Sequence, residues 1–350
     1  MPITNWFLER TLADKTSLNY QQVFSLWVSL RKFNMKFLPI LKIFGRNFCF
    51  YEVLLYICNS LFYFNMKASY DSIPNMFVVN NEPKEVTEIR ATILDKFKDL
   101  IFEEGPHIYY LSNNKSHTFK SVTTRLGDFE NEFNVDEIAE RYALKHGETK
   151  EYWIDEWKFK NLVATTTGSM VHEYGESLGN MLNGNYLGIT EANKAKFIKD
   201  KNWLIPTRPK EKAILSFFQD LNENLHFVLA EAKMYTECLK ENLAGTADIL
   251  FYYKDPKDES KSGLCIFDYK TNAEITKSFS RENGKMLLPP FDDYYDEPKS
   301  IYTLQLSTYS IPLQDLGFNI IARRLVWLKD DGTYEIIPLK DESKRLRNIL

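Results

Sequence analysis

Two segments near residue 260 carry the apolar pattern of neighbouring β-strands. Residues 246–253 and 263–270 are rich in the aliphatic and aromatic residues that strands prefer. The residues between them, 254–262, are polar and include a proline, which is typical of the connection in a hairpin. Because side chains alternate between the two faces of a strand, Asp268 and Lys270 are predicted to share one face.

The rest of the apolar pattern predicts a sheet with helices around it. Helices are expected at residues 84–103, 135–146, 150–163, 167–182, 209–224 and 300–314. Further strands are expected at residues 107–111, 117–121, around Glu231, 319–328 and 333–338. Helices that precede a run of strands indicate an α/β chain of the α+β type, in which a small mixed β-sheet is flanked by helices.

The N-terminal segment, residues 1–65, differs from the rest of the chain. Residues 36–65 are unusually apolar and aromatic, but Lys42, Arg46 and Glu52 interrupt them. The charge-free part that follows is shorter than the ~20 residues that a membrane span needs, so membrane association is not expected. We therefore divide the chain into an apolar N-terminal extension, residues 1–65, whose role the sequence leaves open, and a domain at residues 66–350. A natural translation start at Met66 is a second interpretation.

Length and composition place the chain among ordinary globular proteins. The 350 residues suffice for one sizeable domain with additions or for two small domains, and 44% apolar with 26% charged residues is an ordinary balance. The net charge of −4 gives no global basic field, which argues against a large surface that coats duplex DNA. The four cysteines form no Cys-x-x-Cys pair, so we expect no iron–sulfur cluster, no zinc knuckle and a reducing compartment.

The predicted hairpin brings two acidic side chains together. If it folds symmetrically about Asp258, then Asp248 and Asp268 lie opposite each other. Opposed carboxylates are only about 5 Å apart and repel each other unless a cation lies between them. The pattern therefore predicts a divalent metal ion. Mg²⁺ prefers carboxylate oxygens, and Mn²⁺ is expected to substitute for it.

These residues resemble a known nuclease superfamily. Gly245-Thr-Ala-Asp248, an apolar strand and then Asp268-Tyr-Lys270 are similar to the metal-binding core of the PD-(D/E)XK nucleases. Further elements resemble the RecB-like exonuclease branch in type and in order, namely Gly168-x-x-x-His172-x-x-x-Glu176, Glu231 and Gln305-x-x-x-Tyr309. The segment from His117 to Thr124 is similar to the entry motif of phage exonucleases and the mitochondrial genome maintenance exonuclease, with Lys120 in place of the usual proline.

The resemblance implies a restriction-endonuclease-like core, with its motifs at about residues 165–340 and with helical N-terminal additions. The metal ligands that it implies are Asp248, Asp268, Glu231, His172 and the carbonyl of Tyr269. Lys270 is expected to orient or deprotonate the attacking water, or to offset developing negative charge. Glu176 is expected to orient His172. The residues expected to contact the substrate are Gln305, Tyr309, Ser121, Thr124 and Thr271.

The function implied is that of a metal-dependent DNA nuclease that hydrolyses phosphodiester bonds. We expect an exonuclease of phage or bacterial DNA recombination, replication or repair, in the cytoplasm of a bacterium or a phage-infected host cell. Its partner is expected to be single-stranded or end-containing DNA, with a helicase or annealing protein as a further partner. The alternatives are a structure-specific or restriction-type endonuclease of the same fold, and a catalytically inactive DNA-binding protein. A zinc hydrolase built on His172-Glu-x-x-Glu176 is disfavoured, because the second helical histidine of His-Glu-x-x-His is missing.

Overall fold

A computed structural model describes residues 82–350, apart from residues 104, 107, 183–205 and 238. The predicted extension at residues 1–65 lies outside the described residues. In the described part of the chain, no helix is both long enough and apolar enough to cross a membrane.

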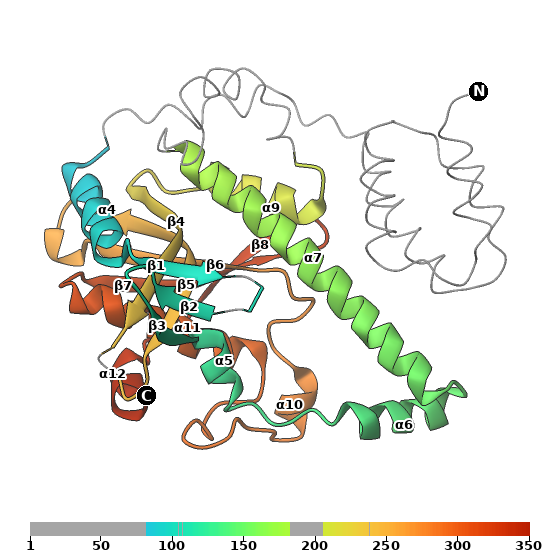
Figure 1. The fold of residues 1–350 in the computed structure, drawn as a ribbon. Coiled ribbons are helices and arrows are strands. Elements are labelled where there is room, and N and C mark those ends of the chain that lie inside the picture. The colour runs from blue at the N-terminus through green and yellow to red at the C-terminus, as the bar shows by residue number, and fades with distance from the viewer. Residues whose placement is uncertain (1–81, 104, 107, 183–205, 238) are drawn as a thin grey trace, which may run out of the picture. The chain divides into compact units, whose positions relative to one another are not determined.

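An open eight-stranded mixed sheet with helices around it forms the described part (Figure 1). The strands are β1 (Leu100–Glu103), β2 (Ile108–Leu111), β3 (Asn114–Ser121), β4 (Leu225–Thr236), β5 (Leu243–Tyr253), β6 (Gly263–Lys270), β7 (Ile320–Leu328) and β8 (Tyr334–Pro338). The α-helices are α4 (Lys84–Phe97), α5 (Val122–Gly127), α6 (Val135–His146), α7 (Lys150–Leu182), α9 (Pro209–Gln219), α10 (Ser278–Glu282), α11 (Pro298–Asp315) and α12 (Ser343–Ile349). The predicted α+β class with a mixed sheet is confirmed.

Several predicted boundaries are wrong. The helix expected at 84–103 ends at Phe97, and residues 100–103 form the edge strand β1. The helix expected at 209–224 ends at Gln219. The two helices expected at 150–163 and 167–182 are one helix, α7. Thr165 lies inside α7 at the predicted break, and its hydroxyl donates to the carbonyl of Asn161, one turn earlier, at 2.9 Å.

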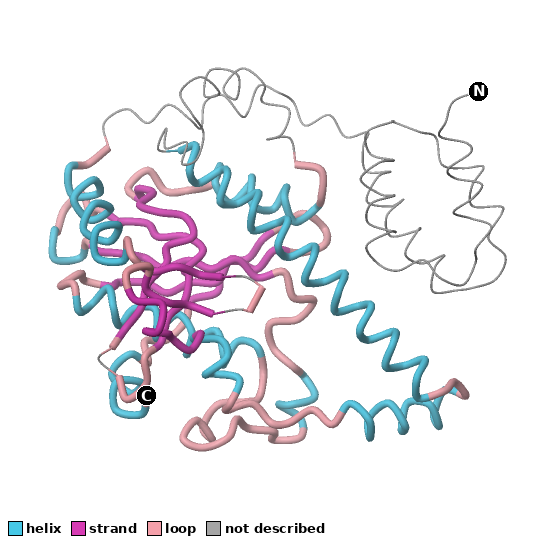
Figure 2. The backbone as a smooth tube through the Cα atoms, viewed as in Figure 1, coloured by secondary structure: helices cyan, strands magenta, loops and turns pink. Residues whose placement is uncertain are grey.

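The helices lie around the sheet on both of its faces (Figure 2). Each face has its own apolar core. On one face, α7 and α9 pack on alternate residues of β5 and β6, such as Ile249 and Phe267. On the other face, α4, α5, α11 and α12 pack on the residues between these, such as Leu250 and Ile266. Both strands are therefore apolar on both sides, which accounts for their nearly continuous hydrophobic sequence.

The sheet forks along β5. Residues Ile249–Tyr253 of β5 pair with β6 in antiparallel register, whereas Leu243 and Ala244 pair with β3 in parallel register. The residues between these two ladders, 245–248, form what we call the sheet fork. They are the Gly-Thr-Ala-Asp stretch that the sequence singles out.

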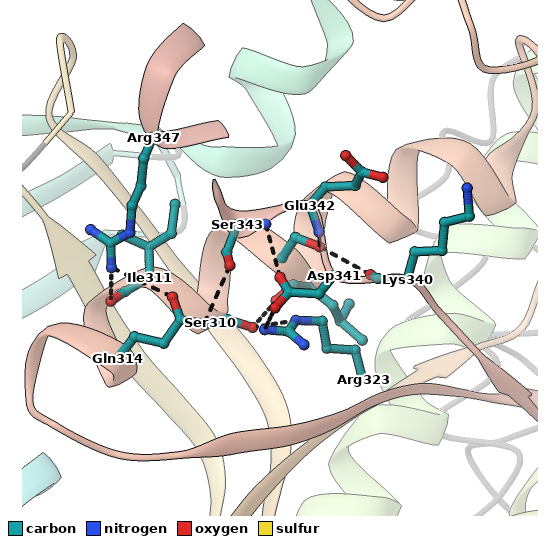
Figure 3. A network of polar contacts seen from close by, with 11 residues as sticks. Ser310, Ile311, Gln314, Arg323, Lys340, Asp341, Glu342, Ser343 and Arg347 are labelled. Carbon is teal, nitrogen blue, oxygen red and sulfur yellow. Dashed lines mark hydrogen bonds and ion pairs between the residues drawn. The ribbon is translucent and has the colours of Figure 1, made fainter. Parts of the chain in front are cut away.

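A polar network fixes α12 beside α11 and β7 (Figure 3). Arg323 is buried on β7, and its Nε donates to the hydroxyl of Ser310 at 2.6 Å. Its Nη2 pairs with Oδ2 of Asp341 at 3.0 Å, and Oδ1 of the same carboxylate accepts the backbone N–H of Ser343 at 2.9 Å. These contacts join β7, α11 and the start of α12.

Candidate metal centre

Three acidic residues form a row across adjacent strands at the sheet fork. The register of β4 and β5 pairs Ala230 with Ile249 and Ala232 with Ala247, which places Glu231 opposite Asp248. The last pair of β5 and β6 is Ile249 with Phe267, so Asp248 and Asp268 come next on their strands. The symmetry about Asp258 that the sequence predicts is therefore present in the register. This row concentrates negative charge in one place.

Glu231 has an unusual backbone conformation. Its φ of 47° lies in the left-handed region, which residues other than glycine rarely adopt. The register of β4 also shifts between Phe227 and Leu229, as in a β-bulge. The strain of a left-handed glutamate costs on the order of 1–3 kcal/mol and is typical of residues whose position is fixed by function.

His172 reaches the row from α7, which lies unusually close to the sheet. A Cβ atom at Gly175 would lie 2.7 Å from Cε2 of Tyr269, and one at Gly179 would lie 2.6 Å from Cε2 of Phe227. Only glycine permits this approach. As a result, Nδ1 of His172 lies 3.3 Å from Oδ1 of Asp248.

Asp248 also closes the end of the β5–β6 ladder. Its Oδ2 accepts the backbone N–H of Tyr269 at 2.6 Å, so a side chain replaces the next strand-to-strand hydrogen bond. The side chain of Tyr269 is buried on the opposite face, as predicted, and its ring lies perpendicular to that of His172 at 5.9 Å. The carbonyl of Tyr269 as a metal ligand stays a prediction.

Asp268, the third acid of the row, forms an ion pair with Lys270. Oδ2 of Asp268 contacts Nζ of Lys270, and Asp268 is almost fully buried. The ammonium also lies 4.3 Å from the ring centre of Tyr302 on α11. Burial alone would lower the pKa of Lys270, but Asp268 and then Asp248 raise it well above its ordinary value. Lys270 is therefore a fixed positive charge at neutral pH.

The acids of the row perturb one another. Burial and the charge of Asp248 raise the pKa of Glu231 to about 8 and that of Asp268 to about 6. Burial would lower the pKa of His172, but Asp248 outweighs it and raises the value to about 9. Burial would raise the pKa of Asp248, and His172 brings it below its ordinary value. Without a cation, Glu231 and His172 thus hold protons at neutral pH.

This arrangement fits a divalent cation. Among the described residues, the one group of His, Cys, Asp and Glu side chains able to hold a metal is His172, Glu231 and Asp248, whose ligand atoms all lie within 4.8 Å of one another. Carboxylate oxygens suit Mg²⁺ and Mn²⁺, and an imidazole nitrogen favours Mn²⁺ of the two. Asp268, also predicted as a ligand, lies next in the row but is paired with Lys270. A cation would take the place of the protons on Glu231 and His172.

Glu176 does not orient His172 as predicted. The partner of His172 is Asp248, whereas Glu176 shares a hydrogen bond with Asn180, one turn further along α7. Burial and the neighbouring Glu173 raise the pKa of Glu176. The four-residue spacing of His172 and Glu176 placed them on one helical face, but it did not determine which side chain the histidine meets.

Gln305 and Tyr309 are buried, at 6% and 4% exposure, and their role as substrate contacts stays a prediction. Nε2 of Gln305 donates to the hydroxyl of Tyr309 at 3.0 Å. A Cβ atom at Gly245 would lie 2.5 Å from Cε1 of Tyr309, so this ring packs directly beneath the sheet fork. The helical spacing that put both side chains on one face was right, but that face is turned towards the core.

The remaining predicted substrate contacts lie around the fork. Ser121 ends β3, and its hydroxyl caps α5 by accepting the backbone N–H of Thr124 at 3.1 Å. Ser121 pairs with Ala244, directly before the fork, and Thr124 is exposed. Thr271 lies where α7 passes, with Oγ1 3.5 Å from the position of a Cβ atom at Gly168. Ser121 and Thr124 thus lie beside the start of the fork, and Thr271 directly follows Lys270; their contact with a substrate stays a prediction.

Two tyrosines at the site were not predicted. The hydroxyl of Tyr109 on β2 lies 3.2 Å from Oγ1 of Thr246 in the fork. Tyr302 lies under Lys270 and comes three residues before Gln305 on α11. The helical spacing from Gln305 could have suggested Tyr302, but no local pattern singles out Tyr109.

No protein-family model matches the chain, and no curated protein matches it either.

Proposed function

We propose that this chain is a metal-dependent DNA nuclease that hydrolyses phosphodiester bonds, and that it acts as an exonuclease. One observation carries the proposal: Glu231, Asp248 and Asp268 form a row on three adjacent strands, with His172 on one side and Lys270 on the other. A row of buried carboxylates is suited to a cation, and a buried ammonium beside it is suited to a phosphate.

The residues of the site would have different roles in the hydrolysis. A bound divalent cation would lower the pKa of a water molecule and neutralise charge on the phosphate. Glu231, Asp248 and His172 would hold it. Lys270 carries a permanent charge because of Asp268, and this favours a role in stabilising negative charge on the phosphate over a role as general base.

The exposure of the site indicates which form of DNA it can accept. Asp268 is 1% exposed and Asp248 8%, so the acids are recessed, whereas the side chain of His172 is 30% exposed. A recessed site admits one strand more readily than a duplex, which supports single-stranded or end-containing DNA as the substrate. Recombination, replication or repair in the cytoplasm of a bacterium or phage-infected cell would provide such DNA, with a helicase or annealing protein as partner.

The test is a time course on end-labelled linear and on circular single-stranded DNA with Mg²⁺, Mn²⁺ or EDTA. We expect metal-dependent loss of the linear DNA while the circles remain intact. Cleaved circles would instead indicate an endonuclease of the same chemistry. Asp248→Asn and Lys270→Met should each abolish cleavage, and Glu259→Gln in the turn of the same hairpin is the matched control. DNA binding without cleavage in every condition would refute the proposed activity in favour of a binding protein.

A further inference from the structure

The ammonium of Lys270 is held from two sides. The carboxylate of Asp268 contacts Nζ, and the face of the Tyr302 ring lies 4.3 Å away. A cation over an aromatic face is attracted by the ring quadrupole, and this attraction is stronger where water is partly excluded. The Lys270 side chain is only 14% exposed. Four methylene groups would otherwise leave the ammonium many rotamers, so the ring selects among them.

Tyr302 is itself anchored to the loop that follows Lys270. Its hydroxyl donates to Oδ1 of Asn272 at 2.8 Å. The backbone carbonyl of Asn272 accepts Nε1–H of Trp327 at 2.8 Å, and the carbonyl of Thr271 accepts Nζ of Lys210 at 2.6 Å. The end of β6 is therefore fixed by side chains from three other elements, and the ring is tied to the same fixed end.

We infer that Tyr302 is a positioning residue: its ring face holds the ammonium of Lys270 in the orientation that meets the phosphate, and its bond to Asn272 has only a minor part in placing the ring. The catalytic part of this inference rests on the proposed function. Its physical part, that the ring holds the ammonium, does not depend on the proposed function. Correct orientation matters because a displacement of about 1 Å at a reacting group lowers rates about a hundredfold.

The roles of the ring and of the hydroxyl can be separated. Tyr302→Phe keeps the ring and removes the bond to Asn272, whereas Tyr302→Leu removes both. Tyr295→Leu is a matched control, because the cation over the ring of Tyr295 is that of Arg281, at 5.6 Å. If the ring positions the lysine, Tyr302→Leu lowers kcat about tenfold with KM unchanged, while Tyr302→Phe stays within about threefold of wild type.

A second measurement needs no activity. In protein with ¹³C-labelled lysine, the ε-methylene protons of Lys270 should resonate upfield, because they are bonded to the carbon next to Nζ, which lies 4.3 Å from the centre of the ring. The resonance is assigned by its loss in Lys270→Met. It should persist in Tyr302→Phe and in Tyr295→Leu and move to the ordinary position in Tyr302→Leu.

The outcomes distinguish the inference from the function on which it rests. A shifted resonance together with a lower kcat in Tyr302→Leu supports the positioning role. An unshifted resonance in the wild type, an unchanged kcat, or a rise in KM alone overturns it, and the rise in KM would make Tyr302 a substrate contact. Inactive wild-type protein overturns the proposed function and the catalytic part of the inference, while the resonance still decides whether Tyr302 holds the lysine.

Discussion

Glu231 offers the most direct test of the electrostatics at the sheet fork. Its pKa rises from an ordinary 4.5 to about 8 in the folded protein, because of burial and the charge of Asp248. Between these two values the folded state holds a proton that the unfolded state has released. The metal-free protein therefore loses stability as the pH rises from about 4.5 to 8. The pKa of His172, raised to about 9, acts in the same direction above pH 6.5.

The size of the effect follows from the shift. Each pH unit between the two pKa values changes the free energy of unfolding by about 1.4 kcal/mol, so Glu231 alone contributes on the order of 5 kcal/mol over the whole interval. Between pH 6 and pH 8 the loss expected from Glu231 is at most about 3 kcal/mol, since the folded carboxyl group begins to ionise as the pH approaches 8. A loss of this size is a large fraction of the stability of an ordinary domain.

The assay is urea unfolding in EDTA at pH 6 and pH 8, for the wild type, Glu231→Gln and the control Glu259→Gln. The wild type and the control should both lose stability as the pH rises. Glu231→Gln should lose clearly less, since glutamine is neutral throughout. Mn²⁺ should restore the wild type more strongly at pH 8 than at pH 6, because the cation replaces protons. Equal pH dependence in the wild type and Glu231→Gln would refute the argument.

Three further substitutions test other parts of the structure. Gly245→Ala forces a Cβ atom to within 2.5 Å of the buried Tyr309 ring and should lower the free energy of unfolding by about 1–3 kcal/mol, as measured by urea unfolding; an unchanged stability would contradict the packing. Gln305→Ala should destabilise the fold by about 1–3 kcal/mol and leave the DNA affinity measured by fluorescence anisotropy unchanged. A loss of affinity without a loss of stability would instead support the predicted role of Gln305 as a substrate contact. Arg323→Ala removes the contacts to Ser310 and Asp341 and should lower the melting temperature by several degrees. The control Lys261→Ala, at the exposed hairpin turn, should leave the melting temperature unchanged. Equal melting temperatures for the two variants would show that the network adds no stability.

Much of the sheet was predictable because its signals are local. The two strands of the hairpin carry apolar residues on both faces, and the polar turn between them fixes where they reverse. The register then follows from symmetry about Asp258, which is why Asp248 and Asp268 come into line. Glu231 was expected near them only through a family resemblance. Its left-handed backbone and the preceding bulge cannot be predicted from a single sequence.

Other features could not be predicted from the sequence because tertiary contacts decide between options that are locally equivalent. Gln305 and Tyr309 share a helical face in the sequence, but only packing beneath Gly245 turns that face towards the core. Glu176 and Asp248 are both acids that could meet His172, and the close approach of α7 to the sheet selects Asp248.

Mn²⁺ titration followed by electron paramagnetic resonance shows whether the cluster at the sheet fork binds a divalent cation. We expect saturable binding by the wild type and by Glu259→Gln at pH 8, and its loss in Asp248→Asn, which removes the carboxylate that contacts His172. Binding by Asp248→Asn equal to that of the wild type, or a wild type that leaves all the Mn²⁺ free, would show that the cluster is not a metal site.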